Sequence, residues 1–497
     1  MTSEGSKGSI SKFRLENEKV DHDVEFGEIQ QFDELVYTKE EEHKLVRKID
    51  LLILPSLCLI FFAQYLDKQS ITYTSVFGLK TDLQMTGNQY SWCSTGFYLC
   101  QLFTTFIFIY FMTMVNRTLL IGVSVVAWGI CCTCLGATQN YAQFVAVRCL
   151  LGATEAACQP CTLLVTQSWY RKKEHPYRMA AWLSMNSLAQ IFGSFFMYGV
   201  GITNQSSLAD WKIMFIICGV ISTFIGTLFV IAIPFTPEKA WFLSERERKI
   251  ALYRIYAESD RFGGSIFSKE QMYECLKFDW LTWCSLAFGF LVCVTSGTTV
   301  FQSLILSDFG YDKFQNMEYG SPSGAVQLAF VWIGVLLVMI FPNYRTVIVQ
   351  LLVIVPIVGN ALLLGLPNNA GWGIIVASWL GSVITCSMSI LLSLNASNIR
   401  GHTKKSIANN LFFVGYCLAA VIYPQWWNFS KDPKFHAGLG VNLASWGLLE
   451  ILMGYYRWKV LRENKKRDEF EKQEDLPEYN IYDDVTDKQD LRHRYSC

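Results

Sequence analysis

The segment from Met214 to Ile233 contains no aspartate, glutamate, lysine or arginine. At about 1.5 Å of rise per residue, a helix over these positions is about 30 Å long, which is the thickness of the hydrocarbon core of a bilayer. Lipid offers no hydrogen-bond partners, so a chain that crosses it in such a segment must be helical. Only 17% of the 497 residues are charged, below the share of about 25% in soluble domains. The sequence therefore predicts a helical membrane protein.

Further apolar segments of spanning length lie on both sides of this one. The predicted spans are residues 49–69, 91–112, 118–137, 141–167, 178–202 and 211–234, then 279–306, 323–342, 346–366, 372–394, 406–427 and 441–460. They predict an all-α membrane protein with twelve transmembrane helices in two groups of six. The expected domains are an N-terminal tail (1–48), a first six-helix bundle (49–234), a central loop (235–278), a second six-helix bundle (279–460) and a C-terminal tail (461–497).

A short sequence likeness links the two groups of six. Asn116-Arg117-Thr118 joins the second and third spans, and Tyr344-Arg345-Thr346 joins the eighth and ninth. Duplicated six-span units are typical of a large class of transporters, which bind substrate between the halves near the middle of the membrane. The central loop contains Ser244-Glu-Arg-Glu247, a capping-box pattern that predicts an amphipathic helix at the membrane face.

The distribution of basic residues predicts the orientation. If the N-terminus is cytosolic, the inside loops carry Arg117, Arg171, Lys172, Lys173, Arg178, Arg345, Arg400, Lys404 and Lys405. The positive-inside rule then favours both termini in the cytosol. The glycosylation sequons Asn204-Gln-Ser206 and Asn428-Phe-Ser430 fall in outside loops. Residues 1–43 lack the apolar core of a cleavable signal, and both tails are expected to be disordered.

Several classes of function are disfavoured. The formal net charge of zero gives no global field that would attract nucleic acid. All six histidines fall in tails or loops, so no histidine proton relay is expected within the membrane. Cys158-Gln-Pro-Cys161 lies in a span without a second cysteine pair, so a metal or redox site is not expected there. The sequence predicts neither an enzyme nor a cofactor.

Few charged residues lie within the predicted spans. Arg148 and Glu155 lie about 10 Å and 21 Å below the outer edge of the fourth span, and their seven-residue spacing places them on one helix face. A charged side chain near the bilayer centre costs about 2.5–3.5 kcal/mol on insertion scales, so it usually faces a cavity or a partner. Glu155 is therefore interpreted either as a proton site or as the partner of Arg148 in a structural ion pair.

For other polar residues in the spans, the sequence indicates a role in a functional site less strongly. Asp67 and Lys68 lie toward the outer end of the first span, and because consecutive helical residues diverge by about 100° they cannot face one spot. They are interpreted either as interfacial residues, with Lys68 reaching water, or as site residues. Glu450, deep in the last span, is expected to serve packing or the lipid boundary. The candidates for lining a cavity, or alternatively for helix packing, are Asn186, Gln190, Thr295, Ser296, Thr298, Thr299, Gln302, Ser387, Ser389 and Asn395.

Four motifs together carry a family resemblance. They are Tyr65-Leu66-Asp67-Lys68, Arg148-x-Leu-Leu-Gly-x-x-Glu155-Ala-x-x-x-Pro160, Trp169-Tyr170-x-x-x-Glu174 and Asn398-x-x-Gly401-x-Thr403-Lys404. Over about residues 45–465 the combination resembles the anion:cation symporters of the major facilitator superfamily, and within them the fungal allantoate-permease branch. Pro237-x-x-Ala240-x-Phe242-Leu243 in the central loop and Asp484-Val-Thr-Asp487 in the C-terminal tail also fit that branch.

The resemblance implies two pseudo-symmetric six-helix bundles and a monomeric, proton-coupled symporter that imports a small organic anion across the plasma membrane. Members of that branch carry allantoate, nicotinate, pantothenate, cysteine and other sulfur-containing anions. Carried over by position, Asp67 and Glu155 are proton-site candidates, while Lys68 and Arg148 are anion-site candidates, with Tyr65 beside them. Relatives commonly have arginine at the position of Lys68, and lysine lacks the planar fork that binds a carboxylate bidentately.

These roles combine into a mechanism. Burial favours the neutral form of Glu155, whereas a nearby Arg148 favours the charged form. An arriving carboxylate or sulfonate that engages Arg148 and Lys68 is expected to weaken the arginine's hold on Glu155, which then takes a proton, so that anion and proton travel together. The superfamily's loop signature is degraded to Thr113-Met-Val-Asn-Arg-Thr118, so the cytosolic gate is expected to use other contacts. The alternatives are a proton-driven exporter of organic solutes and a receptor that binds a nutrient without transporting it.

Overall fold

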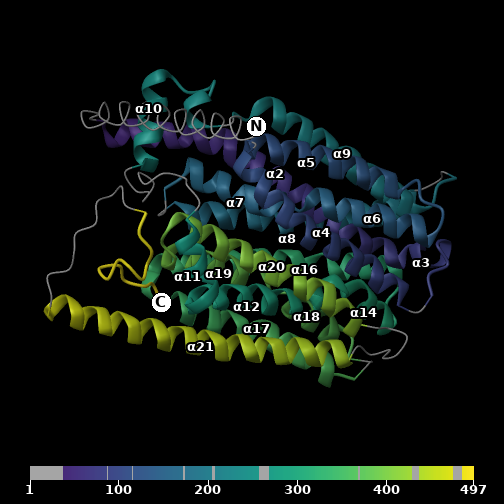
Figure 1. Cartoon of the computed structure of the whole chain (residues 1–497). Coiled ribbons are helices and arrows are strands. Elements are labelled where there is room, and N and C mark those ends of the chain that lie inside the picture. Colours follow the sequence, from purple (N-terminus) through teal and green to yellow (C-terminus); the bar gives the residue numbers. More distant parts are fainter. Residues whose placement is uncertain are drawn as a thin grey trace, which may run out of the picture.

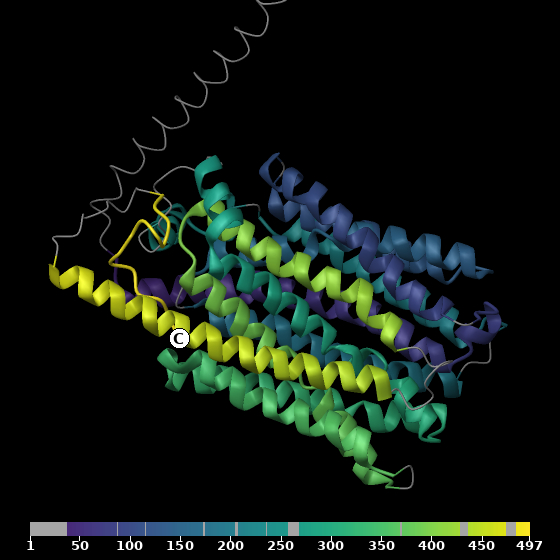
Figure 2. The ribbon, with the colours of Figure 1, turned by 60° about the horizontal axis from the view of Figure 1, so that its bottom comes forward.

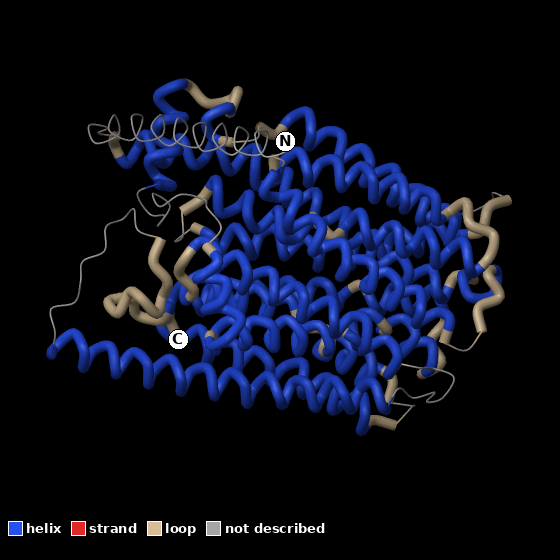
Figure 3. Tube along the Cα trace, in the orientation of Figure 1, coloured by secondary structure: helices blue, strands red, loops and turns tan. Residues whose placement is uncertain are grey.

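The computed structural model describes residues 37–473 and 484–497, except residues 87, 115, 172–173, 204–206, 235, 257–267, 368–369 and 428–435. Within these residues the regular structure is entirely helical (Figure 3). The two predicted glycosylation sequons and the predicted inside residues Lys172 and Lys173 lie outside the described residues.

The first half of the chain forms one group of helices. Its elements are α2 (Lys39–Val76), α3 (Leu79–Asp82), α4 (Gln89–Met114), α5 (Arg117–Leu135), α6 (Tyr141–Glu155), α7 (Cys158–Trp169), α8 (His175–Thr203) and α9 (Asp210–Ala232). The segment between the halves holds η1 (Pro237–Lys239), α10 (Glu245–Tyr256) and α11 (Lys269–Phe278). The predicted capping box at the start of α10 is present, since the Ser244 backbone N–H donates to Glu247 Oε2 at 2.9 Å and the Glu247 N–H to Ser244 Oγ at 3.4 Å.

The second half forms another group. Its elements are α12 (Trp280–Val294), α13 (Gly297–Val300), α14 (Gln302–Asp308), α15 (Lys313–Gly320), α16 (Pro322–Ile340), η2 (Pro342–Tyr344), α17 (Arg345–Gly365), α18 (Trp372–Gly381), α19 (Thr385–Asn398), α20 (His402–Trp426) and α21 (His436–Gln473). All twelve predicted spans are confirmed as helical segments. In the described part of the chain, nine helical segments are long and apolar enough to cross a membrane on length and composition alone.

The same helix pairs recur in the two halves. The first and fifth spans pack together as α2 and α8, and their counterparts in the second half, α12 and α20, do the same. The third and sixth spans pair as α5 and α9, and the ninth and twelfth as α17 and α21. Across the halves, α8 packs on α16 and α4 packs on α20. Figures 1 and 2 show the two halves side by side with α21 on the outside of the second, which is the predicted pseudo-symmetric arrangement of two six-helix bundles.

The bundle has two distinguishable ends. Figure 1 shows α10, α11 and the C-terminal residues at one end, called here the terminal end, and α3 and α14 at the opposite end, called the far end. The N-terminal part of α2 also lies at the terminal end. α2 begins at Lys39, ahead of the predicted start of the first span at residue 49, because a capping box between Thr38 and Glu41 begins the helix in the polar segment.

Some helices approach one another at backbone distance. A Cβ atom on Gly289 of α12 would lie 1.9 Å from the carbonyl oxygen of Phe412 in α20, and one on Gly152 of α6 would lie 2.1 Å from the carbonyl oxygen of Phe97 in α4. Helices in lipid associate through close van der Waals packing rather than through the hydrophobic effect. These two glycines therefore permit contacts within each half that no other residue would allow.

Three of the predicted spans are interrupted. The fourth breaks after Glu155, between α6 and α7, although residues 141–167 were predicted to be continuous. Pro160 explains this break, because it has no N–H to donate to the carbonyl group of Ala156 four residues earlier. Ala156 and Ala157 are both buried, so the irregular backbone is enclosed by protein, as it must be at membrane depth.

The seventh and tenth spans are interrupted as well. Residues 279–306 form α12, α13 and α14, and residues 372–394 fall in α18 and α19, so the continuous spans predicted there are also wrong. Hydroxyl groups donate to backbone carbonyl oxygens at both places, from Thr295 to Val292 at 2.8 Å and from Ser382 to Trp379 at 2.8 Å. Such side-chain bonds compete with the helical pattern and favour bends.

The C-terminal tail is ordered where it is described, contrary to the prediction. α21 continues beyond residue 460 as far as Gln473, and residues 484–497 fold back on the terminal end of the second half. The backbone N–H of Arg345 donates to the carbonyl oxygen of Cys497 at 2.7 Å, and Arg467 Nη2 donates to the Tyr495 hydroxyl at 2.6 Å. The charged composition of the tail suggested disorder. The contacts that order it could not be predicted, because each is made with a partner far away in the sequence.

A fully buried lysine holds this tail. Lys404 Nζ lies 2.8 Å from Glu274 Oε1, 3.2 Å from Asp279 Oδ1 and 2.8 Å from Asp487 Oδ1, and the side chains of Lys404, Asp279 and Asp487 have 0% exposure. Asp487 comes from the tail, whereas the other two acids come from α11 and the residue after it. One cation therefore joins the tail, the central loop and the start of α20.

Replacing Lys404 with methionine is expected to destabilise the protein by about 3–5 kcal/mol, because three carboxylates would lose the cation that they share in a buried site. The check is thermal unfolding of the purified full chain in detergent. Lys466→Met is the matched control: Lys466 pairs with Glu463 at 3.1 Å but is 48% exposed, so its loss should cost no more than about 1 kcal/mol. Equal melting temperatures for the two variants would contradict a stabilising role for Lys404.

Candidate functional site

A cavity of about 90 Å³ lies between the two halves. One water needs about 10–15 Å³ of such volume, so there is room for several waters or a small organic molecule. Residues of α2, α4, α6, α7 and α8 line it on one side, and residues of α12, α13, α19 and α20 on the other. The three interrupted spans all contribute, with Gln159, Ser296 and Thr385 close to the breaks. Broken helices at mid-membrane are typical of substrate sites in transporters.

Glu155 is paired at the edge of this cavity. Its Oε1 atom lies 2.8 Å from Lys68 Nζ and accepts a hydrogen bond from Gln64 Nε2 at 2.7 Å. The Glu155 side chain is 1% exposed and that of Lys68 13% exposed. Lys68 and Gln64 line the cavity, so a molecule in it would touch the cation that neutralises Glu155.

The ion pair considered between Arg148 and Glu155 is not formed. Seven residues of helix separate the two positions by about 10 Å along the axis, which is too far for direct contact even on one face, since helical side chains meet at spacings of three and four. The partner of Glu155 comes instead from α2. Glu155 therefore forms its ion pair with Lys68 rather than with Arg148.

Arg148 is a buried cation without an ionic partner. It lines the cavity and is 3% exposed, and within the described residues its Nε and Nη2 atoms have no hydrogen-bond partner. Its guanidinium carbon lies 5.8 Å from the ring centre of Phe144 and 5.7 Å from that of Phe215. These rings provide a cation–π environment but no counter-charge.

Asp67 points away from the cavity. Its Oδ2 atom accepts hydrogen bonds from Trp128 Nε1 at 2.9 Å and from Ser222 Oγ at 2.8 Å, so it lies against α5 and α9. The divergence predicted for Asp67 and Lys68 is confirmed. Because both residues lie in the interior, at 2% exposure for Asp67 and 13% for the Lys68 side chain, the interfacial interpretation of this pair is wrong.

The other predicted site residues divide into three groups. Tyr65, Asn186, Ser296 and Thr299 line the cavity. Gln190 and Gln302 line a second cavity of about 10 Å³, and Gln190 Nε2 donates to Gln302 Oε1 at 3.2 Å. The remaining candidates are bonded elsewhere: Thr298 Oγ1 donates to Asn360 Oδ1 at 2.5 Å, and Asn395 Nδ2 donates to Ser285 Oγ at 2.6 Å.

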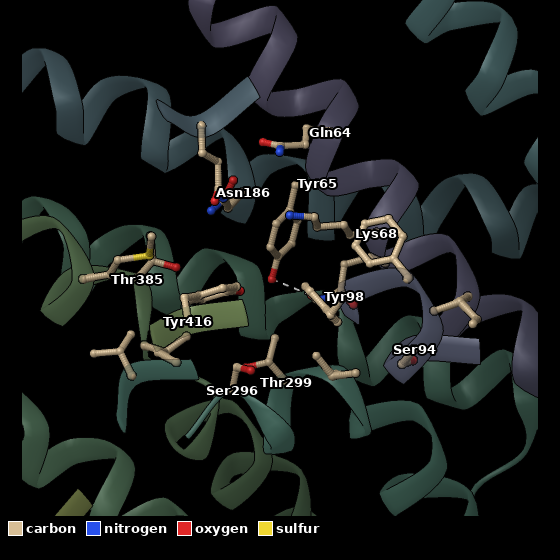
Figure 4. A pocket seen from close by; sticks show the side chains of 18 of the residues that line it. Gln64, Tyr65, Lys68, Ser94, Tyr98, Asn186, Ser296, Thr299, Thr385 and Tyr416 are labelled. Carbon is tan, nitrogen blue, oxygen red and sulfur yellow. Dashed lines mark hydrogen bonds between the residues drawn. The ribbon is translucent and has the colours of Figure 1, made fainter. Parts of the chain in front are cut away.

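Aromatic side chains form much of the cavity wall, and sequence reasoning found only one of them. Tyr65 and Tyr98 come from the first half, and Tyr416 and Tyr423 from the second. Figure 4 shows Tyr65, Tyr98 and Tyr416 directed into the same space as Lys68. In a chain with 15% aromatic residues, no spacing rule separates a cavity tyrosine from a core tyrosine.

Contacts between the two halves lie on the far-end side of the cavity. Thr72 Oγ1 donates to the carbonyl oxygen of Val300 at 2.8 Å, and Gln190 Nε2 donates to Ser323 Oγ at 2.7 Å. Farther out, the rings of Phe77 and Phe314 meet edge to face with centres 5.9 Å apart. A ligand in the cavity is therefore separated from the far end by hydrogen bonds and a ring contact, both of which can break and re-form.

Comparison with known proteins agrees with this architecture. The model of the Major Facilitator Superfamily matches residues 57–424. The allantoate permease of Saccharomyces cerevisiae is 31% identical, with 97% of this chain and 91% of that protein aligned. An uncharacterized transporter of Schizosaccharomyces pombe is 32% identical over 92% of this chain and 90% of the relative. The thiamine pathway transporter of Saccharomyces cerevisiae is 26% identical over 91% and 86%.

Two solved structures share the fold. A bacterial homolog of the human lysosomal transporter Spinster, in an inward-facing and unoccupied conformation, aligns with a TM-score of 0.55 at 15% identity over 84% of this chain and 97% of that one. The nucleoside transporter NupG aligns with a TM-score of 0.57 at 11% identity over 81% and 98%. The family match over most of the chain and the relatives above 30% identity show that this chain is a multi-pass membrane transporter of the major facilitator superfamily, in the branch of the allantoate permease.

Proposed function

We propose that the protein is a proton-coupled symporter that imports a small organic anion across the plasma membrane, with its terminal end in the cytosol. The observation that carries the proposal is the pairing of two features on one cavity. Arg148, a buried guanidinium without an ionic partner among the described residues, lines the same cavity as Lys68, which is paired with the buried Glu155. The first supplies an anion site, and the second supplies a carboxylate whose charge depends on that site.

The anion site consists of Arg148 and Lys68. A carboxylate or sulfonate that accepts hydrogen bonds from Arg148 would satisfy nitrogen atoms that otherwise lack partners. Charge-assisted bonds of this kind are short and about twice as strong as neutral ones. Binding is favoured further because Arg148 is already buried, at 3% exposure, so little additional desolvation of the guanidinium is needed.

Proton coupling follows from competition for Lys68. When the substrate anion draws the Lys68 ammonium toward itself, Glu155 loses its counter-charge in a nearly dry environment, where the ionised form is costly. Glu155 then takes a proton, and the loaded carrier holds anion and proton together. This revises the mechanism inferred from the sequence, since the cation that releases Glu155 is lysine rather than arginine. Asp67 stays a second proton-site candidate, on the side of α5 and α9.

Rocking of the two halves about the cavity would complete the cycle. The hydrogen bonds at the far end close one side, and their rupture would open it. The name of the allantoate permease, which is 31% identical, supports an organic anion as cargo, and the nearly complete alignment of the two chains supports a shared mode of transport.

The test is uptake of labelled allantoate and labelled nicotinate by a fungal strain that lacks its own permeases and expresses the full chain. We expect at least one anion to accumulate above its outside concentration at acidic outside pH, and a protonophore should abolish the accumulation. Faster loss of preloaded anion than from control cells, without uptake, would identify an exporter. Binding of the anion to purified protein without flux in either direction would identify a receptor. Either of these two results would overturn the proposal.

A further inference from the structure

A second, smaller cavity between the two halves has no part in the proposed mechanism. Its volume is about 10 Å³, which is about what one water molecule needs and too little for an organic anion. Residues of α2 and α8 line it from the first half, and residues of α13, α14 and α15 from the second. Gln69 and Thr299 line both this cavity and the large one, so the two cavities are neighbours.

Two buried oxygen atoms at the small cavity have no hydrogen-bond partner among the described residues. They are Gln190 Oε1 in α8 and Asn316 Oδ1 in α15. The two residues are 3% and 1% exposed and line the same space. A buried amide oxygen without a partner is costly and rare in proteins. Each half of the molecule therefore brings one unsatisfied acceptor to this cavity.

The bonds of the two amide groups show which end of each is left over. Asn316 Nδ2 donates to the carbonyl oxygen of Ser303 at 3.3 Å, and because a carbonyl oxygen only accepts, the nitrogen must lie on that side. Gln190 Nε2 donates to Gln302 Oε1 at 3.2 Å and to Ser323 Oγ at 2.7 Å. Both nitrogen atoms are occupied, so the oxygen is the atom that each residue has left to bond.

Hydroxyl groups around the cavity use their hydrogen atoms elsewhere. Thr72 Oγ1 donates to the carbonyl oxygen of Val300 at 2.8 Å. The hydroxyls of Tyr73 and Ser194 both donate to the carbonyl oxygen of Gln190, at 3.0 Å and 2.9 Å. A hydroxyl has only one hydrogen atom to donate. The wall of the cavity therefore offers mainly acceptors, and its occupant has to be a donor.

Water fits such a wall better than a cation does. Among the described residues no carboxylate lines the small cavity, and a cation buried without a counter-charge is costly. Water is neutral and has two hydrogen atoms, one for Gln190 Oε1 and one for Asn316 Oδ1. Buried waters typically make two to four hydrogen bonds of this kind to groups that would otherwise be unsatisfied.

We propose that the small cavity is a binding site for one water molecule, which bridges the two halves by donating to Gln190 Oε1 on the first and to Asn316 Oδ1 on the second. A bridging water is nearly as good as a direct hydrogen bond. It adds to the direct bonds that Thr72 and Gln190 make between the halves. When the halves part there in transport, the water is released and bulk water solvates both oxygens. The inference depends neither on the cargo nor on proton coupling.

Gly320 in α15 offers a way to displace the water. The residue is buried and lines the cavity, and apart from its own helix backbone a Cβ atom on it would have no neighbour within 4 Å. Gly320→Ala places a methyl group there, which bonds to neither oxygen, whereas Gly320→Ser places a hydroxyl that can donate to one of them. We expect the purified full chain with alanine to unfold about 1–3 °C below the chain with serine, although alanine is the better helix former.

Two further measurements identify the occupant. A structure that resolves ordered waters should show one peak within about 2.7–3.2 Å of both oxygen atoms. The unfolding temperature of the parent should be the same in sodium, potassium and choline chloride at equal ionic strength. Greater stability in sodium or potassium would identify a cation site and overturn the proposal.

The pair of variants can also overturn it. If Gly320→Ala unfolds at the same temperature as Gly320→Ser or above it, the cavity does not need a donor and the two oxygens are not bridged. An empty cavity in the resolved structure leads to the same conclusion. None of these outcomes touches the proposed anion symport, which is tested by uptake.

Discussion

Glutamine in place of Glu155 is expected to abolish proton-driven accumulation of substrate while leaving exchange of substrate across the membrane. Glutamine has nearly the same shape and can still bond to Gln64, but it carries no exchangeable proton and no charge. Lys68 then faces the cavity without its counter-ion, so anion binding should be retained or strengthened. The measurement is uptake against a proton gradient in cells, paired with exchange of labelled for unlabelled anion in vesicles without a gradient.

Glu450→Gln is the matched control for this variant. Glu450 also lies within a membrane-spanning helix, α21, and its Oε1 atom is buried without a hydrogen-bond partner in the described part of the chain. It does not line the cavity, so its neutral variant should accumulate substrate like the parent. If Glu155→Gln accumulates substrate as well, Glu155 has only a structural role, and proton coupling must be sought at Asp67.

Methionine in place of Arg148 is expected to weaken anion binding by about 30-fold to several thousand-fold, since loss of one partner of a buried charge-assisted contact costs about 2–5 kcal/mol. The same variant should unfold at the same temperature as the parent or a higher one. Removal of an unpaired buried cation relieves a cost of about 2.5–3.5 kcal/mol on insertion scales. Affinity and stability are thus predicted to move in opposite directions, as measured by calorimetry and by thermal unfolding of the unliganded protein.

Arg178→Met is the control variant, for which we expect the opposite effects on stability and affinity. Arg178 is also almost fully buried, with a side chain that is 1% exposed, but it is paired with Asp50 at 2.7 Å and Glu174 at 3.5 Å. Its replacement should lower stability, because two carboxylates lose their cation, and should leave anion affinity unchanged. If Arg148→Met behaves like Arg178→Met, with lower stability and unchanged affinity, the guanidinium of Arg148 is structural and the anion site lies elsewhere.

Much of the fold could be predicted because hydrocarbon imposes a simple demand on sequence. A span needs length, apolar side chains and internally satisfied backbone groups, and each of these is visible in a segment such as 214–233. The interruptions were missed because a broken span keeps the same apolar composition as a continuous one. Pro160 was the available signal, yet proline is tolerated inside other helices of this chain, such as α2 at Pro55 and α17 at Pro356.

The site was predicted in part. Burial of charge marked Arg148, Glu155 and Lys68 because such residues are expensive in lipid. Their pairing could not be predicted, because it depends on how α2 lies against α6 rather than on spacing within one helix. Thr298 and Asn395 show the converse error, since hydroxyls and amides in a span serve helix packing as readily as a cavity.

The interrupted helices have a consequence for how the protein is accommodated in the lipid bilayer. The irregular turns are enclosed, because Ala157, Thr295 and Ser382 are all buried. By contrast, α9 is continuous, and its exposed surface consists of apolar side chains such as Phe224 and Ile231. The backbone carbonyl groups at the breaks, which lack helical hydrogen bonds, are thus kept in the protein interior and away from lipid. The breaks divide these inner spans into short segments, whereas the outer helix α9 is continuous.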